Sequence, residues 1–264
     1  MKRARRIVVK VGTSTLAHAD SGKLNLYRIE HLIRELADLH NAGKEIIFVS
    51  SGAIAAGMNK LGIKNKPQTV PENQALAAIG QGVLMHIYEK FFAEYGQTIG
   101  QILLTKENAA DAHARENSRN SLQTILSMGA IPIVNENDAV AVDEIKIGDN
   151  DNLSAIVAAM IDAEVLIILS DIDGLYTANP NVDKSARLID EVEEITPEIE
   201  RIAGGAGTKL GTGGMFTKIQ AAKFATANGV TMLIVNGNTN GNLRRALSGE
   251  PIGTVFTRRL ISNE

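Results

Sequence analysis

The sequence predicts an α/β protein with a mostly parallel sheet that is covered by helices on both faces. Short β-branched and aliphatic runs alternate with longer amphipathic segments along the chain, which is the pattern of strand–helix–strand units. The strand-like runs are apolar at successive positions, as expected where both faces of a sheet are buried. No linker, internal repeat or low-complexity segment interrupts the 264 residues, so we expect a single domain spanning residues 1–264.

The composition excludes several classes of protein. The chain contains no cysteine, so it has no disulfide, thiolate metal ligand or thiol nucleophile. Its formal net charge of −3 gives no reason to expect a nucleic-acid partner. The basic start is followed only by a strand-length apolar stretch, too short for a signal-peptide core, and no apolar run reaches the roughly 18 residues of a membrane span. We therefore expect a cytoplasmic protein without membrane partners.

The first elements lead to a turn of small residues. The strand Arg6–Val11 is β-branched and apolar, and the helix Leu26–Asn41 repeats apolar residues at helical spacing behind the N-cap Asn25. A second strand over residues 45–49 runs into Ser50–Gly57, which opens another helix. Free backbone N–H groups at such a start can bind an anion, although small residues there are also explained by tight packing.

A long amphipathic helix begins at Pro71 and continues to about Tyr95. Gly80 and Gly82 lie inside it, where glycine costs stability. We therefore expect a close helix contact at these glycines, within the fold or at a subunit interface. The next predicted elements are a strand over residues 98–104, a helix over 117–128 and a strand over 130–134.

The second half of the chain continues the alternation. Residues 178–201 are polar and contain Pro180 and Pro197, which predicts a surface excursion with one acidic helix. The remaining predicted helices cover residues 153–160, 219–227 and 243–247, and the remaining strands cover 164–169, 231–235 and 253–256.

Two polar runs near the middle of the chain, Asn135–Asp138 and Gly148–Asn152, are the first candidates for a site. The first follows a buried strand and the second opens a helix, so amides and carboxylates lie where open α/β sheets bind ligands. Either run alone is also explained as a turn that satisfies its own backbone. The segment between them, Ala139–Ile147, alternates in part and predicts a short hairpin arm or lid.

The glycine-rich stretch Gly204–Lys218 opens a helix with a lysine in its first turn, which is typical of a phosphate cradle. It matches neither a P-loop nor a dinucleotide fingerprint, and the alternative is a flexible linker. Lys10, at the end of the first strand, needs an anionic partner unless it extends to solvent. Phosphoryl transfer needs positioning and neutralised charge, so Lys10 and Lys218 fit that chemistry, with Asp151 as the candidate that holds both.

Five stretches, in order along the chain, resemble the glutamate-phosphorylating branch of the amino acid kinase family. They are Val8–Ser14, Ser51–Gly57, Asn135–Asp138, Gly148–Asn152 and Gly211–Lys218. The resemblance implies a three-layer α/β/α sandwich with one main sheet. It also implies ATP- and Mg²⁺-dependent phosphorylation of the γ-carboxylate of L-glutamate to L-glutamyl 5-phosphate, the first step of proline synthesis.

The resemblance further implies roles for individual residues. Lys10 and Lys218 would stabilise the transferring phosphoryl group, with Asp151 organising them. Glutamate would be bound by Ser51, Gly52, Asp138 and Asn150. ATP would be bound by Lys10, Ser170, Asp171, Thr212, Gly213, Gly214, Met215, Phe216, Thr217 and Lys218. By their chemistry, Asp138 suits an α-ammonium group, while Asn150 and the N–H groups near Ser51 suit carboxylates. No residue is assigned as a metal ligand.

Other properties of the family are carried over as expectations. We expect a homo-oligomer, either a dimer or a tetramer, and inhibition by proline. Many members carry a C-terminal PUA domain, an RNA-binding-type module, which we do not expect here. Two alternatives remain open: a kinase of this fold that acts on acetylglutamate, aspartate, carbamate or UMP, and a non-catalytic sensor of glutamate or nucleotide.

Overall fold

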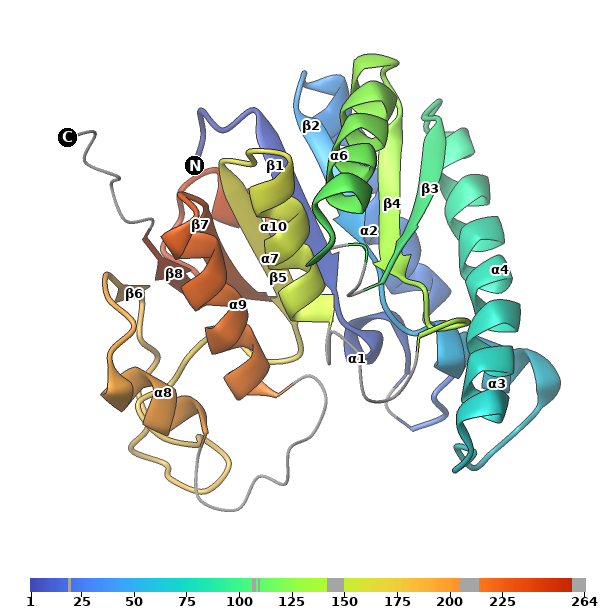
Figure 1. Ribbon diagram of the computed structural model, residues 1–264. Coiled ribbons are helices and arrows are strands. Elements are labelled where there is room, and N and C mark those ends of the chain that lie inside the picture. The colour runs from blue at the N-terminus through green and yellow to red at the C-terminus, as the bar shows by residue number, and fades with distance from the viewer. Residues whose placement is uncertain (19, 106–107, 109, 142–149, 205–213, 258–264) are drawn as a thin grey trace.

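One sheet runs through the middle of the computed structural model (Figure 1). The structure describes residues 1–264 except 19, 106–107, 109, 142–149, 205–213 and 258–264. Within these residues eight strands pair in the order β3-β4-β2-β1-β5-β7-β8-β6, and every neighbouring pair is parallel except β7 with β8. The strands are β1 (Arg6–Val11), β2 (Glu45–Val49), β3 (Ile99–Leu104), β4 (Ile131–Glu136), β5 (Val165–Ser170), β6 (Glu191–Val192), β7 (Thr231–Asn236) and β8 (Thr254–Phe256).

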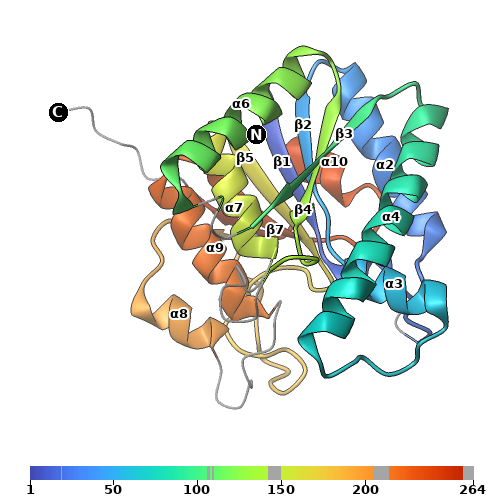
Figure 2. The ribbon, with the colours of Figure 1, turned by 45° about the vertical axis from the view of Figure 1, so that its right-hand side comes forward.

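Helices cover both faces of this sheet (Figures 1 and 2). They are α1 (Thr13–Leu16), α2 (Leu26–Asn41), α3 (Ala53–Leu61), α4 (Val70–Glu94), α6 (Ala112–Ser127), α7 (Asn150–Met160), α8 (Pro197–Ala203), α9 (Met215–Ala227) and α10 (Asn242–Leu247). None of the described helices is long and apolar enough to cross a membrane.

Alternate residues of the central strand enter two separate cores, which explains why its sequence is apolar throughout. Val8 of β1 packs in a core with residues of α6, α7 and α9. Its neighbours Ile7 and Val9 pack on the opposite face, with residues of α2, α4 and α10. The predicted three-layer α/β/α sandwich with a mostly parallel sheet is therefore confirmed.

Several elements differ from the prediction. The strand β4 continues through Asn135 and Glu136, which pair in register with Leu103 and Leu104 of β3, so the first polar run begins inside the sheet. Helix α6 begins five residues before the predicted start, because the side chain of Asp111 accepts a hydrogen bond from the backbone N–H of Ala114 at 2.7 Å. The polar excursion contains the short strand β6. Most of the predicted lid lies outside the described residues.

Helices α3 and α4 approach closely through glycine. A Cβ atom on Gly80 would lie 1.7 Å from the carbonyl oxygen of Ala53, and one on Gly57 would lie 2.1 Å from that of Leu76. The close helix contact predicted at Gly80 is therefore confirmed, and it lies within the chain. A Cβ atom on Gly82 would meet nothing within 4 Å.

Candidate active site

The candidate site lies at the carboxyl edge of the sheet, beside β1. The strand β1 is flanked by β2 on one side and β5 on the other, so connections leave these strands in opposite directions and open a crevice between them. A cavity of about 570 Å³ occupies this edge. The predicted site residues that line it are Lys10, Ser51, Gly52, Asp138, Asn150, Ser170, Asp171 and Lys218.

Two lysines from distant parts of the chain share one carboxylate at the wall of this cavity. Lys10 Nζ lies 2.5 Å from Asp151 Oδ1, and Lys218 Nζ lies 3.0 Å from Asp151 Oδ2. The side chains of Lys10 and Lys218 are 4% and 6% exposed, and that of Asp151 is 0% exposed. The formal charges of the three side chains of this Lys10–Asp151–Lys218 triad sum to one positive charge, which favours an anion nearby.

The helices α7 and α9 place the members of this triad. Asp151 lies in the first turn of α7, where the helix dipole favours a carboxylate. Its position is reinforced by Ser154, whose Oγ donates to the Asp151 carbonyl oxygen at 2.6 Å. Lys218 lies in the first turn of α9, and Thr217 Oγ1 lies 3.1 Å from Asp151 Oδ2. The first turn of α9 therefore brings Lys218 to the same carboxylate as Lys10.

The remaining predicted ATP residues divide into three groups. Ser170 and Asp171 line the cavity at the end of β5, and Ser170 Oγ donates to Asp171 Oδ1 at 3.2 Å. Gly214 is the N-cap of α9, and Met215, Phe216 and Thr217 of its first turn are not in the cavity lining, whereas Lys218 is. Thr212 and Gly213 lie outside the described residues. Contacts of this group with ATP therefore remain predictions.

The residues predicted for glutamate meet on the opposite side of the cavity, between β2 and α7. Asn150 Nδ2 lies 2.7 Å from the carbonyl oxygen of Ser50, 2.9 Å from Ser51 Oγ and 2.8 Å from Asn135 Oδ1. The N–H groups of Asn150 are thus engaged within the protein, contrary to the expectation that they serve a ligand carboxylate. Gly52 is the N-cap of α3 and has a φ of 90°, a conformation that favours glycine.

Several residues of the site were not predicted. Thr13 and Ser14 of α1 line the cavity, and so do Lys66 and Glu136. Tyr88 of α4 lies beneath Ser50, with its hydroxyl 2.7 Å from Ser50 Oγ, and burial raises the pKa of Tyr88 well above its usual range. The runs that contain Thr13, Ser14 and Glu136 were recognised, but the positions of Lys66 and Tyr88 carry no sequence motif.

The cavity also contains carboxylates that suit a divalent cation. Glu136, Asp138 and Asp171 line it. Among the described residues, no three histidine, aspartate or glutamate side chains gather into a metal cluster. Mg²⁺ in nucleotide sites takes one or two carboxylates in addition to phosphate oxygens and water, so this donor set fits a metal that arrives with a nucleotide.

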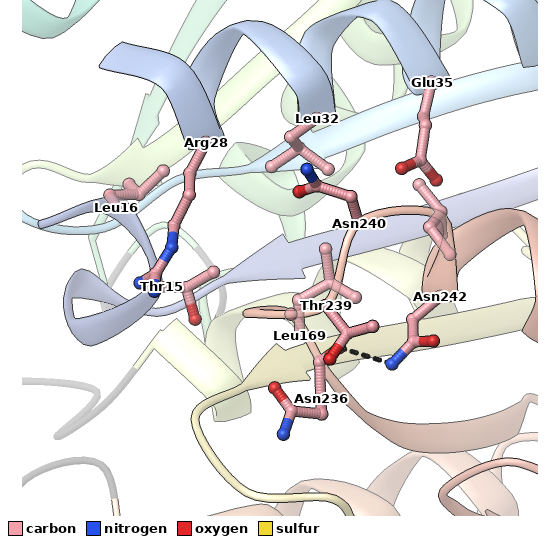
Figure 3. Close-up of a pocket in the computed structure, with 12 residues that line it drawn as sticks. Thr15, Leu16, Arg28, Leu32, Glu35, Leu169, Asn236, Thr239, Asn240 and Asn242 are labelled. Atoms are coloured by element: carbon pink, nitrogen blue, oxygen red, sulfur yellow. Dashed lines mark hydrogen bonds between the residues drawn. The ribbon is translucent and has the colours of Figure 1, made fainter. Parts of the chain in front are cut away.

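A second cavity lies on the other side of α1 (Figure 3). Thr15 and Arg28 line it together with Asn236 and Asn242, and Asn242 Nδ2 donates to the carbonyl oxygen of Asn236 at 3.0 Å. Its volume is only about 20 Å³, which is space for about one water molecule. The larger cavity beside the triad is therefore the candidate active site.

Comparisons with known proteins agree with this geometry. Residues 5–236 match the model of the amino acid kinase family. The chain is 57% identical over 256 residues to a glutamate 5-kinase of Clostridium acetobutylicum, covering 97% of this chain and 96% of that protein. It is 55% identical to a glutamate 5-kinase of Moorella thermoacetica, covering 98% of this chain and 68% of that protein.

Solved structures with lower sequence identity show the same fold. A carbamate kinase from Giardia lamblia has a TM-score of 0.69 at 18% identity, with 98% of this chain and 100% of that chain covered. An isopentenyl phosphate kinase has a TM-score of 0.67 at 21% identity, with 96% and 100% covered. The chain therefore belongs to the amino acid kinase family and, within it, to the glutamate 5-kinases.

Proposed function

We propose that this chain transfers the γ-phosphoryl group of ATP to the γ-carboxylate of L-glutamate, forming L-glutamyl 5-phosphate and ADP in the first step of proline biosynthesis. The Lys10–Asp151–Lys218 triad at the cavity wall is the single observation that carries the proposal. It supplies two positioned ammonium groups where a nucleotide and an anionic acceptor would otherwise repel each other.

The reaction needs little covalent participation by the protein. The ordinary pKa of a glutamate side chain is about 4.3, so the acceptor is already ionised near neutral pH and needs no general base. A carboxylate oxygen forms a bond to the γ-phosphorus while the bond from that phosphorus to the β,γ-bridging oxygen breaks. The released electron pair leaves on ADP. Lys10 and Lys218 offset the negative charge of the transferring group in the transition state.

The two sides of the cavity accommodate the two substrates. Ser170 and Asp171, together with the start of α9, are the residues that we assign to ATP. Ser51, Gly52, Asp138 and Asn150 are assigned to glutamate. The triad lies between these groups of residues, which supports transfer from one substrate to the other.

Mg²⁺ is part of the proposal as the ion that accompanies ATP. When bound, it would neutralise the charge on the phosphate oxygens. Asp171, beside the residues assigned to the nucleotide, is the carboxylate placed to hold it, directly or through water.

We also propose that the active protein is a homo-oligomer and that proline inhibits it. The outer face of α4 supports the proposed oligomer, because Ile79 is 40% exposed and a Cβ atom on Gly82 would meet nothing within 4 Å. Proline shares an α-carboxylate and a cationic amino group with glutamate, which supports its binding in the same cavity.

The proposal is tested by trapping the acyl phosphate with hydroxylamine. The purified protein is incubated with ATP, Mg²⁺, L-glutamate and hydroxylamine, and the hydroxamate is measured. Parallel reactions contain aspartate or N-acetylglutamate, and ADP release is followed with carbamate and UMP. We expect a signal with glutamate alone.

Other outcomes have clear meanings. Activity with a different acceptor would agree with the proposed role of the triad. It would contradict the assignment of Ser51, Gly52, Asp138 and Asn150 to the binding of glutamate. ATP binding without turnover of any acceptor would contradict the proposed activity and favour a sensor.

A further inference from the structure

The amide of Asn150 is held in one orientation. Its Nδ2 donates to the main-chain carbonyl oxygen of Ser50 at 2.7 Å, and this oxygen can only accept. Nδ2 also lies 2.8 Å from Asn135 Oδ1. A flipped amide would place its oxygen against both acceptors, so Oδ1 is the end of Asn150 that remains for a ligand.

The orientation of Asn135 is set in turn by two further groups. Its Oδ1 accepts from the backbone N–H of Glu136 at 2.9 Å, which identifies that atom as the oxygen. Its Nδ2 donates to Gln81 Oε1 at 2.8 Å. Gln81 comes from α4 and does not line the large cavity. A chain of hydrogen bonds therefore runs from Gln81 through Asn135 to Asn150.

This series of hydrogen bonds ends at an acceptor that has no partner among the residues that the structure describes. Asn150 Oδ1 is buried and accepts no hydrogen bond, although Asn150 lines the large cavity. Buried polar atoms in native proteins are nearly always paired with protein groups or ordered water, so a donor that enters the cavity would satisfy this oxygen. Glutamate has one cationic donor, its α-ammonium group, and its two carboxylates are acceptors only.

We propose that Gln81 is a positioning residue for glutamate. By accepting from Asn135, it keeps Asn150 turned so that Oδ1 receives the α-ammonium group. This inference rests on the proposed function, and it assigns Asn150 to the amino end of the substrate, on the same side as Asp138. An acceptor at this point also disfavours substrates whose nitrogen is acylated, because they bring a neutral amide in place of a cation.

The test compares Gln81→Met with two other variants. Methionine has the length of glutamine but gives Asn135 no comparable acceptor. Gln81→Glu retains an oxygen acceptor at the same place. Gln101→Met is the matched control, because Gln101 lines the same 320 Å³ cavity as Gln81 and is exposed on β3.

The readouts are the KM for glutamate, the KM for ATP and turnover of glutarate, which is glutamate without its amino group. We expect Gln81→Met to raise the KM for glutamate by about three- to tenfold, which is the effect of losing one hydrogen bond. The KM for ATP should not change. Turnover of glutarate should match the wild type, since glutarate has no α-ammonium group to lose. Gln81→Glu and Gln101→Met should keep the wild-type KM for glutamate.

Each contrary result has a distinct meaning. A wild-type protein that is inactive with glutamate contradicts the proposed function itself. An active wild type with an unchanged KM in Gln81→Met overturns the positioning role. Equal losses with glutamate and glutarate, or an equal rise of KM in Gln81→Glu and Gln81→Met, also overturn it, because they indicate a general disturbance of α4. If Gln81→Met does not fold, Gln81→Leu is measured in its place against the same criteria.

Discussion

Lys218 is buried and paired with Asp151. Its replacement should therefore lower the reaction rate far more than the replacement of a surface lysine. We expect Lys218→Ala to lower kcat by about 10²- to 10³-fold, the usual effect of removing one preorganised donor to the transition state. Lys218→Arg should also be poor, because a planar guanidinium does not replace a compact ammonium. Steady-state kinetics of hydroxamate formation measures both.

Lys223 gives the control for this experiment. It lies on the same helix, α9, and pairs with Glu200 at 2.6 Å with its side chain 58% exposed. Exposed ion pairs contribute little, so Lys223→Ala should keep the wild-type kcat. Unchanged turnover in Lys218→Ala would remove Lys218 from the mechanism.

Tyr88 should make the stability of the protein depend on alkaline pH. Burial raises the pKa of its hydroxyl, so the folded chain keeps this proton while the unfolded chain loses it above about pH 10. The unfolded state then binds fewer protons, and the free energy of unfolding falls by about 1.4 kcal/mol per pH unit above that point.

The effect is measured by denaturant titrations of the wild type and of Tyr88→Phe, from pH 8 to the highest pH at which both proteins are still folded without denaturant. Below the unfolded pKa the two proteins should differ only by the lost hydrogen bond to Ser50, about 0.5–1.5 kcal/mol. Above it, the wild type should lose stability more steeply than Tyr88→Phe. If the free energy of unfolding depends on pH in the same way in both proteins, the raised pKa of Tyr88 is contradicted.

The charged residues of the site were easier to predict than the neutral ones that position them. Lys10, Asp151 and Lys218 carry a chemical requirement, because a buried charge needs a partner. Gln81 and Tyr88 belong to an amphipathic helix, where a polar side chain ordinarily faces solvent. Only the approach of α4 to β2 and β4 gives them buried partners, and the sequence carries no local signal for that approach.

The two glycines of α4 provide a matched pair. Gly80→Ala places a Cβ atom 1.7 Å from the carbonyl oxygen of Ala53, so α3 and α4 must separate, and we expect a loss of at least about 1–3 kcal/mol in the free energy of unfolding. Gly82→Ala meets nothing within 4 Å and should gain about 0.5–1 kcal/mol from the higher helix propensity of alanine.

Thermal and denaturant unfolding of the two variants gives the comparison. Helix α3 begins directly after Ser51 and Gly52, so Gly80→Ala should also raise the KM for glutamate. Equal stability of the two alanine variants would show that the close contact between α3 and α4 is not maintained.

Secondary structure was predicted well where the spacing of apolar residues determines an element. It was predicted less well where polar residues form part of the element. The strands β1 and β2 and the helix α2 have the predicted boundaries. The strand β4 extends into polar residues, because pairing with β3 provides backbone partners for Asn135 and Glu136. The strand β6 has two residues, too few for an alternating pattern, and it exists because β8 lies beside it.

Proline and glutamate share an α-carboxylate and a cationic amino group, so they should compete within the cavity beside the triad. We expect proline to raise the apparent KM for glutamate while kcat at saturating glutamate stays constant and the KM for ATP is unchanged. The measurement is a series of glutamate titrations at fixed ATP with increasing proline. A lower kcat at an unchanged KM would instead require a second proline site.

The triad also has a consequence for synthesis on the ribosome. Asp151 follows Lys10 by 141 residues and precedes Lys218 by 67 residues. A nascent chain therefore holds no complete phosphoryl-transfer centre until α9 has emerged and docked on α7. Fragments that separate Lys10 from Lys218 should each be inert toward ATP and regain turnover only when they reassociate, so the chain is suited to division into a two-part reporter of protein proximity.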